Sequence, residues 1–78
     1  MTNRTNQWRI AFNLQAQMNP TLSRHEDSFL QILGNAEEEH FFEPEYMDTY
    51  IFNSLENLVG SSAPNIARTY ESIAKITA

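Results

Sequence analysis

The sequence predicts an all-α domain, a compact bundle of about four short helices with a break at Glu43-Pro44. Three observations support this fold class. Apolar residues recur at intervals of three and four, strand-like alternation is almost absent, and proline or glycine separates the periodic segments. Amphipathic helices with short connections favour an antiparallel bundle, because each apolar stripe is then covered by its neighbours.

The first predicted helix spans Asn6 to Met18. Its apolar side carries Trp8, Ala11, Phe12, Gln15 and Met18, with Ile10 and Leu14 on the neighbouring strip. We expect Trp8 and Phe12 to lie in the core, because aromatic residues at helical spacing are what a small bundle buries. Asn19-Pro20 ends the helix, since the residue before a proline is pushed out of the helical region.

The second predicted helix spans Pro20 to Leu33, with Leu22, Phe29, Ile32 and Leu33 on its buried face. Residues 23–26 have the spacing of a capping box, so a start three or four residues later is an alternative. Gly34 is expected to close this helix. A separate short helix, Ala36 to Phe42, should follow and stop at the break, because Pro44 interrupts a helix.

Two more helices complete the bundle. The segment from Pro44 to Val59 is expected to bury Met47, Ile51, Leu55 and Leu58, and Gly60 should end it. The last helix, Pro64 to Thr77, places Ile66, Tyr70, Ile73 and Ile76 along one face. Tyr70 and Ile73 are therefore predicted to be core residues.

Length and composition limit what the chain can be. With 78 residues we expect residues 1–78 to form a single helical domain, frayed at residues 1–5. The absence of cysteine removes disulfides and thiolate ligands, so the reducing cytoplasm is the expected location. No segment approaches the roughly 20 apolar residues that span a bilayer, and we expect no membrane association.

Charge is distributed unevenly. The formal net charge is −5, and no Lys or Arg lies between Arg24 and Arg68, whereas nine of the ten acidic residues do. Such an acidic middle argues against direct binding to nucleic acid, where Lys and Arg supply most of the affinity for phosphate. A helix-turn-helix interpretation fails for the same reason, since its recognition helix would be Ala36 to Phe42 with three glutamates.

The most unusual feature is an acidic aromatic segment, residues 37–48. Two interpretations stay open. The segment is either a docking site, in which carboxylates steer a basic partner and aromatic rings anchor it, or a solvated helix start whose aromatic residues face the core. The predicted partner-binding residues are Glu37, Glu38, Glu39, Phe41, Phe42, Glu43, Glu45, Tyr46 and Asp48.

Catalytic and metal chemistry find little support. Glu37 and His40 have the spacing of a carboxylate-bridged metal site, but no second Glu-x-x-His is present. The sequence has no nucleophile elbow, no cysteine and no glycine-rich phosphate loop. We therefore predict no catalytic residues, no metal and no cofactor, and a protein that is not an enzyme.

Two functional hypotheses follow. The first is a non-catalytic inhibitor or adaptor that docks on a basic surface of a larger protein, including one within a nucleoprotein complex. Small acidic anti-defence proteins of phages and mobile elements act in this way as a class, an analogy that rests on size and charge. The alternative is an assembly module, a homodimer or subunit in which Asn6 to Met18 and Pro44 to Val59 pair between chains.

Overall fold

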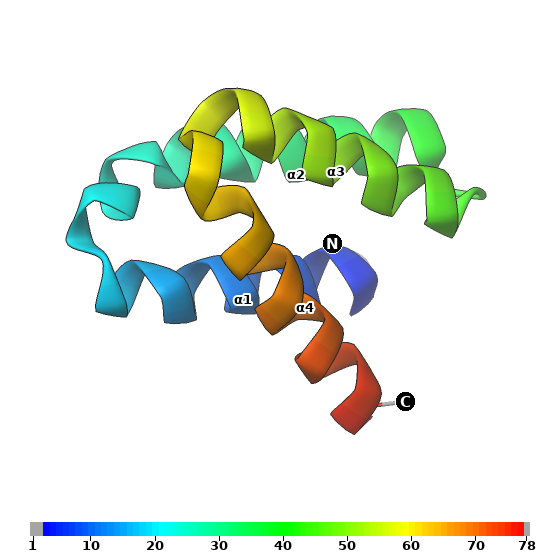
Figure 1. Cartoon of the computed structure of the whole chain (residues 1–78). Helices are drawn as coiled ribbons and strands as arrows, with labels where there is room; N and C mark the ends of the chain where they lie inside the picture. The colour runs from blue at the N-terminus through cyan, green and yellow to red at the C-terminus, as the bar shows by residue number, and fades with distance from the viewer. Residues whose placement is uncertain (1–2, 78) are drawn as a thin grey trace.

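The computed structural model describes residues 3–77, and within them every regular element is helical (Figure 1). The elements are α1 (Asn3–Met18), the 3₁₀-helix η1 (Pro20–His25), α2 (Glu26–His40), α3 (Pro44–Val59), the 3₁₀-helix η2 (Gly60–Ser62) and α4 (Ala63–Thr77). The predicted all-α class is confirmed. The predicted break is also present, because α2 ends at His40 and Pro44 is the first residue of α3.

The helices form two packed pairs. α2 and α3 run side by side, and α4 descends from the end of α3 across α1 (Figure 1). The corner between α2 and α3 and the first turns of α1 lie toward the same end of the bundle (Figure 1). This arrangement brings the acidic aromatic segment close to residues at the start of the chain.

The core is built around two stacked aromatic pairs. The rings of Trp8 and Tyr70 have centroids 4.1 Å apart, and those of Phe12 and Phe29 have centroids 4.6 Å apart. All four side chains are buried, as predicted for Trp8, Phe12 and Tyr70, while Ile73 is partly buried against the core. The other buried apolar residues are Ala11, Leu22, Leu33, Ala36, Met47, Ile51, Leu55, Ala63 and Ile66.

The second helix begins late and continues past its predicted end. Residues 20–25 form η1, and the α-helix starts only at Glu26, which is later than both predicted starts. The predicted capping box is wrong, because the N-cap residue is His25 and its side chain makes no capping hydrogen bond. The predicted stop at Gly34 and the separate helix Ala36 to Phe42 are wrong, because α2 runs without interruption to His40. Phe29, Leu33 and Ala36 lie on one face and are fully buried. Their burial outweighs the roughly 1 kcal/mol that glycine costs inside a helix.

The start of the chain is more ordered than the sequence suggests. Helix α1 already includes Asn3, Arg4 and Thr5, so the predicted fraying is wrong for residues 3–5, and residues 1 and 2 lie outside the described part. Thr5 is fully buried, and its hydroxyl donates a hydrogen bond to the carboxylate of Glu37 on α2. This contact anchors the first turn of α1.

Two predicted inward positions are exposed. Met18 is 72% exposed and Ile76 is 84% exposed. Met18 is the last residue of α1, and Ile76 lies in the last turn of α4, which projects beyond the other helices (Figure 1). Neighbouring helices therefore do not cover either side chain.

Replacing Gly34 by alanine should stabilise the protein by about 0.5–1 kcal/mol, because alanine restricts the unfolded chain and suits a helix interior. The space around Gly34 is open, so an added Cβ meets no atom within 4 Å. The measurement is urea unfolding followed by circular dichroism.

Gly60→Ala is the matched control. Gly60 ends α3 with a φ of 60°, a conformation that favours glycine. This variant should be less stable than the native protein. Equal effects of the two substitutions would contradict the assignment of Gly34 to a helix interior.

Candidate functional site

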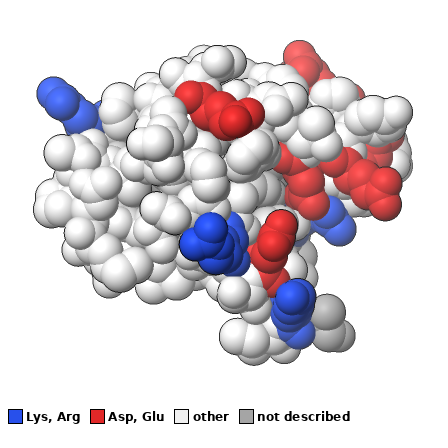
Figure 2. Space-filling model, in the orientation of Figure 1, with Lys and Arg blue, Asp and Glu red and all other residues white. Residues whose placement is uncertain are grey.

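The acidic aromatic segment forms one end of the molecule. It comprises the last turn of α2, the corner at residues 41–43 and the first turns of α3. Acidic side chains gather over this end of α2 and α3, on the right in Figure 2, whereas much of the opposite end carries no charge in that view. The sequence-level acidic block is therefore a localised patch on the surface.

Three aromatic side chains of the segment point outward. Phe42 is 89% exposed, Tyr46 is 64% exposed and Phe41 is 55% exposed. The interpretation in which these residues face the core is therefore wrong. The rings of Phe41 and Phe42 form an edge-to-face pair with centroids 4.8 Å apart. The pair creates an apolar ridge that no helix of the described chain covers.

The tight corner explains why these rings are exposed. The carbonyl of His40 accepts a hydrogen bond from the backbone N–H of Glu43, which closes the chain between α2 and α3. Pro44 begins α3, and the carbonyl of Glu43 accepts the first helical hydrogen bond from Met47. The residues at the tip then project from the end of the bundle, while Met47 turns back into the core.

His40, the last residue of α2, contacts side chains of the corner and of α3. Its Nδ1 lies 3.4 Å from a carboxylate oxygen of Glu43, and its ring lies near those of Tyr46 and Tyr50, at centroid distances of 6.3 Å and 5.6 Å. We call the exposed part of the segment the acidic aromatic surface. It consists of Glu38, Glu39, Phe41, Phe42, Glu43, Glu45 and Tyr46.

Two predicted partner-binding residues have internal roles. Glu37 is partly buried and accepts the hydrogen bond from Thr5. Asp48 is partly buried and binds three side chains from two other helices. The structure therefore brings seven of the nine predicted residues together on one surface and places the other two at its base.

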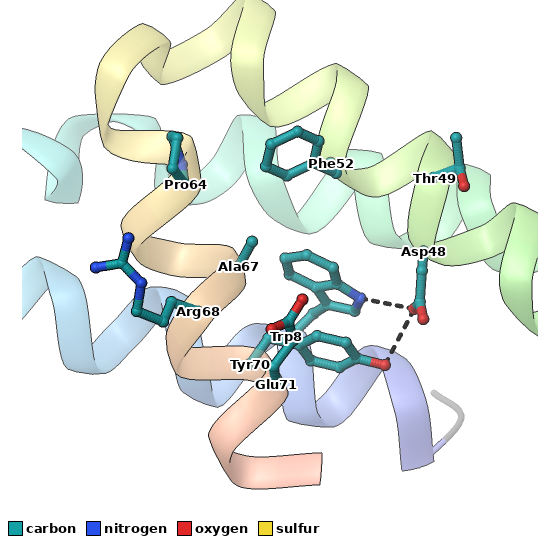
Figure 3. Close-up of a pocket in the computed structure, with 9 residues that line it drawn as sticks. All are labelled: Trp8, Asp48, Thr49, Phe52, Pro64, Ala67, Arg68, Tyr70 and Glu71. Atoms are coloured by element: carbon teal, nitrogen blue, oxygen red, sulfur yellow. Dashed lines mark hydrogen bonds between the residues drawn. The ribbon is translucent and has the colours of Figure 1, made fainter. Parts of the chain in front are cut away.

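Asp48 is the centre of a polar network. Its Oδ1 accepts hydrogen bonds from Trp8 Nε1 and from the Tyr70 hydroxyl, each at 3.0 Å (Figure 3). Its Oδ2 accepts a hydrogen bond from Arg4 Nη1 at 2.5 Å, and the same nitrogen lies 3.3 Å from the carbonyl oxygen of Pro44. One carboxylate on α3 thus binds both α1 and α4.

Sequence reasoning placed Asp48 in the acidic patch and missed this role. A buried tryptophan and a buried tyrosine each need a hydrogen-bond acceptor, which is the signal that was available. Helix positions alone do not show which of ten acidic residues supplies that acceptor, because the three donors lie 22 to 44 residues away.

A hollow opens beside Asp48, between α3 and α4. Its volume is about 500 Å³, and Phe52 and Ala67 point toward it from the two helices, with the Trp8 indole beside them (Figure 3). The hollow arises from the way the helices cross, which apolar spacing in the sequence does not predict. The lining residues are Trp8, Asp48, Thr49, Phe52, Pro64, Ala67, Arg68, Tyr70 and Glu71.

A second hollow, of about 480 Å³, lies at the start of α3. Two carboxylates and one aromatic ring share its lining with the Arg4 guanidinium, so acidic groups outnumber basic ones there. The lining residues are Arg4, Glu43, Pro44, Glu45 and Tyr46. This hollow is part of the acidic aromatic surface.

The described part of the chain contains neither an assembled metal site nor a helix suited to span a membrane. Residues 3–77 contain no group of three or more His, Asp or Glu side chains that could hold a metal ion, so Glu37 and His40 are not joined by further ligands. Within the same residues, no helix combines the length and apolar character needed to cross a membrane.

No protein-family model, curated protein or solved structure significantly matches the chain.

The Tyr70 hydroxyl should make stability depend on alkaline pH. Burial, and next the negative charge of Asp48, raise the pKa of Tyr70 from 10.0 to about 12. The folded state therefore holds this proton more tightly than the unfolded state, so its contribution is complete below pH 10 and is lost as pH rises through 12. Thermal unfolding at a series of pH values measures the loss.

Tyr70→Phe is the control for this prediction. Near pH 8 it should be less stable by about 1 kcal/mol, because Asp48 loses one hydrogen bond. The difference between the native protein and the variant should shrink above pH 10 and reverse sign before pH 12, because the loss over two pKa units exceeds the contribution of one hydrogen bond. A difference that stays constant across this range would show that Tyr70 is not the responsible group.

Proposed function

We propose that the protein is a non-catalytic inhibitor or adaptor, which docks through the acidic aromatic surface onto a basic surface of a larger protein. The observation that carries this proposal is the exposure of Phe42, Tyr46 and Phe41 among carboxylates at one end of the bundle. Aromatic residues are the usual anchors of protein interfaces, and an exposed cluster of them marks a binding surface.

The energetics favour a partner at this position. The side chain of Phe42 gains little from folding because it is 89% exposed, whereas burial in a complex contributes about 25 cal/mol for each Å² of apolar surface. The surrounding carboxylates raise the rate of encounter with a basic surface and disfavour acidic partners. Apolar anchors and charge steering therefore act on the same side of the molecule.

The charge of the surface also indicates the class of partner. A protein surface that binds nucleic acid is rich in Lys and Arg, so it complements Glu38, Glu39, Glu43 and Glu45. The same carboxylates would repel nucleic acid itself. We therefore propose a cytoplasmic target that is a nucleic-acid-binding protein or a nucleoprotein complex, with anti-defence proteins of phages and mobile elements as the functional analogy.

A second candidate function is self-assembly through α1. Ile10, Leu14 and Met18 follow one stripe of this helix and are 37%, 42% and 72% exposed. The stripe suits a helical homodimer or a subunit contact. The predicted pairing through α3 has less support, because Met47, Ile51 and Leu55 are buried within the chain's own core.

The first experiment removes charge from the acidic aromatic surface. The triple variant Glu38→Gln, Glu39→Gln, Glu45→Gln should lose most of its binding to a partner captured from lysate of the source cells, because charge steering is removed. The measurement is quantitative mass spectrometry of the captured proteins at about 0.05 M and 0.5 M salt, since salt screens charge-led contacts.

The matched control is Glu26→Gln, Asp27→Asn, Glu56→Gln, which removes the carboxylates of three exposed residues elsewhere. It should capture the same partner as the native protein. Equal capture by both triple variants would overturn the proposed function. If only further copies of the chain are captured, the self-assembly candidate is favoured.

The second experiment tests the aromatic anchor. Phe42→Ser should weaken binding of the captured partner about tenfold or more while leaving stability within about 0.5 kcal/mol, because the side chain is almost fully exposed. Measured affinity and melting temperature separate the two effects. An unchanged affinity would exclude Phe42 as an anchor.

A further inference from the structure

The hollow between α3 and α4 adjoins the acidic aromatic surface. Asp48 lines this hollow, and its ion-pair partner Arg4 lines the second hollow together with Glu43, Glu45 and Tyr46. The two hollows thus lie on either side of one ion pair. A segment of a partner that lies along α3 from Glu45 would next meet Thr49 and Phe52.

The wall of the hollow between α3 and α4 suits an apolar group. Phe52, Ala67, Pro64 and the Trp8 ring are the apolar groups that line it (Figure 3). Two of the lining residues, Trp8 and Tyr70, have polar groups that already donate to Asp48, from Trp8 Nε1 and from the Tyr70 hydroxyl. Since these donors are occupied, the inner wall favours apolar contact over hydrogen bonding.

The rim of this hollow is close to neutral. The carboxylate of Asp48 is paired with Arg4, and Glu71 and Arg68 carry opposite charges. The preference for a basic segment therefore rests on Glu43 and Glu45, which line the second hollow.

We propose that this hollow receives a large apolar side chain, such as leucine or an aromatic residue, from the same basic partner. This inference rests on the proposed function and deepens it, because it specifies a second anchor. Glu45 and Phe52 are seven residues apart and lie on one stripe of α3, about 10 Å from each other along the helix axis. The partner segment should therefore carry a basic residue and, about two helical turns away, an apolar one.

A pair of synthetic peptides tests this geometry. The first is an alanine-based helix of about 16 residues with two adjacent arginines and a leucine seven positions after them, and the second has alanine in place of that leucine. Trp8 is the single tryptophan and lines the hollow, so its fluorescence reports binding. The leucine peptide should bind about tenfold more tightly than the alanine peptide.

Ala67→Arg should abolish the preference for leucine, because the new side chain fills the hollow. Asn65→Arg is the matched control, since it adds the same charge at an exposed position of α4 outside the hollow. Thr49→Arg blocks the hollow from α3 and replaces Ala67→Arg if that variant does not fold. Melting temperatures verify folding in each case.

Equal affinity of the two peptides for the native protein, or no binding of either, would overturn the inference. A leucine preference that survives both blocking variants would do the same. The lysate experiment with the two triple variants is independent of these peptides. If the lysate experiment gives the expected result and the peptide experiment does not, the proposed function is supported and the acidic aromatic surface is its only anchor.

Discussion

The carboxylate of Asp48 joins the two halves of the bundle, and the presentation of the acidic aromatic surface depends on it. It lies on α3, accepts hydrogen bonds from Arg4 and Trp8 on α1, and accepts one from Tyr70 on α4. A small core can bury an indole and a phenol only if their polar groups are satisfied, because an unpaired buried donor costs about 1–3 kcal/mol. The stacked rings of Trp8 and Tyr70 and their shared acceptor therefore form one cooperative unit.

This unit fixes the start of α3 against the start of α1, and the Thr5 to Glu37 hydrogen bond fixes the end of α2 against the same turn. The corner between α2 and α3 is thus held from both sides, although its own residues contribute little to the core. Phe41 and Phe42 can remain exposed because their burial is not needed for folding. A pre-organised apolar ridge loses less conformational entropy on binding than a mobile loop would, which favours affinity.

Much of the architecture could be predicted from the sequence, because apolar spacing and proline positions determine which faces are buried and where helices begin. Met47, Ile51 and Leu55 on α3, and the break before Pro44, follow directly from such patterns.

Gly34 was misinterpreted because local propensity favoured a helix end, while tertiary burial of Leu33 and Ala36 continued the helix. Glu38 and Asp48 both belong to the acidic aromatic segment, but Glu38 is exposed and Asp48 is partly buried. The sequence does not predict this difference in burial, because it depends on contacts between helices that are distant in the chain. The hollow beside Phe52 depends on helix angles, which apolar spacing does not define.

The ridge formed by Phe41 and Phe42 is proposed to contact a different, basic protein. The most direct measurement is photo-crosslinking in the source cells, with a benzophenone amino acid placed at Phe42 in one variant and at Leu14 on α1 in another. Crosslinks from position 42 to one basic protein, with no such product from position 14, are the predicted result. Crosslinks from position 14 to a second copy of the chain, with no product from position 42, would contradict the claim and support self-assembly.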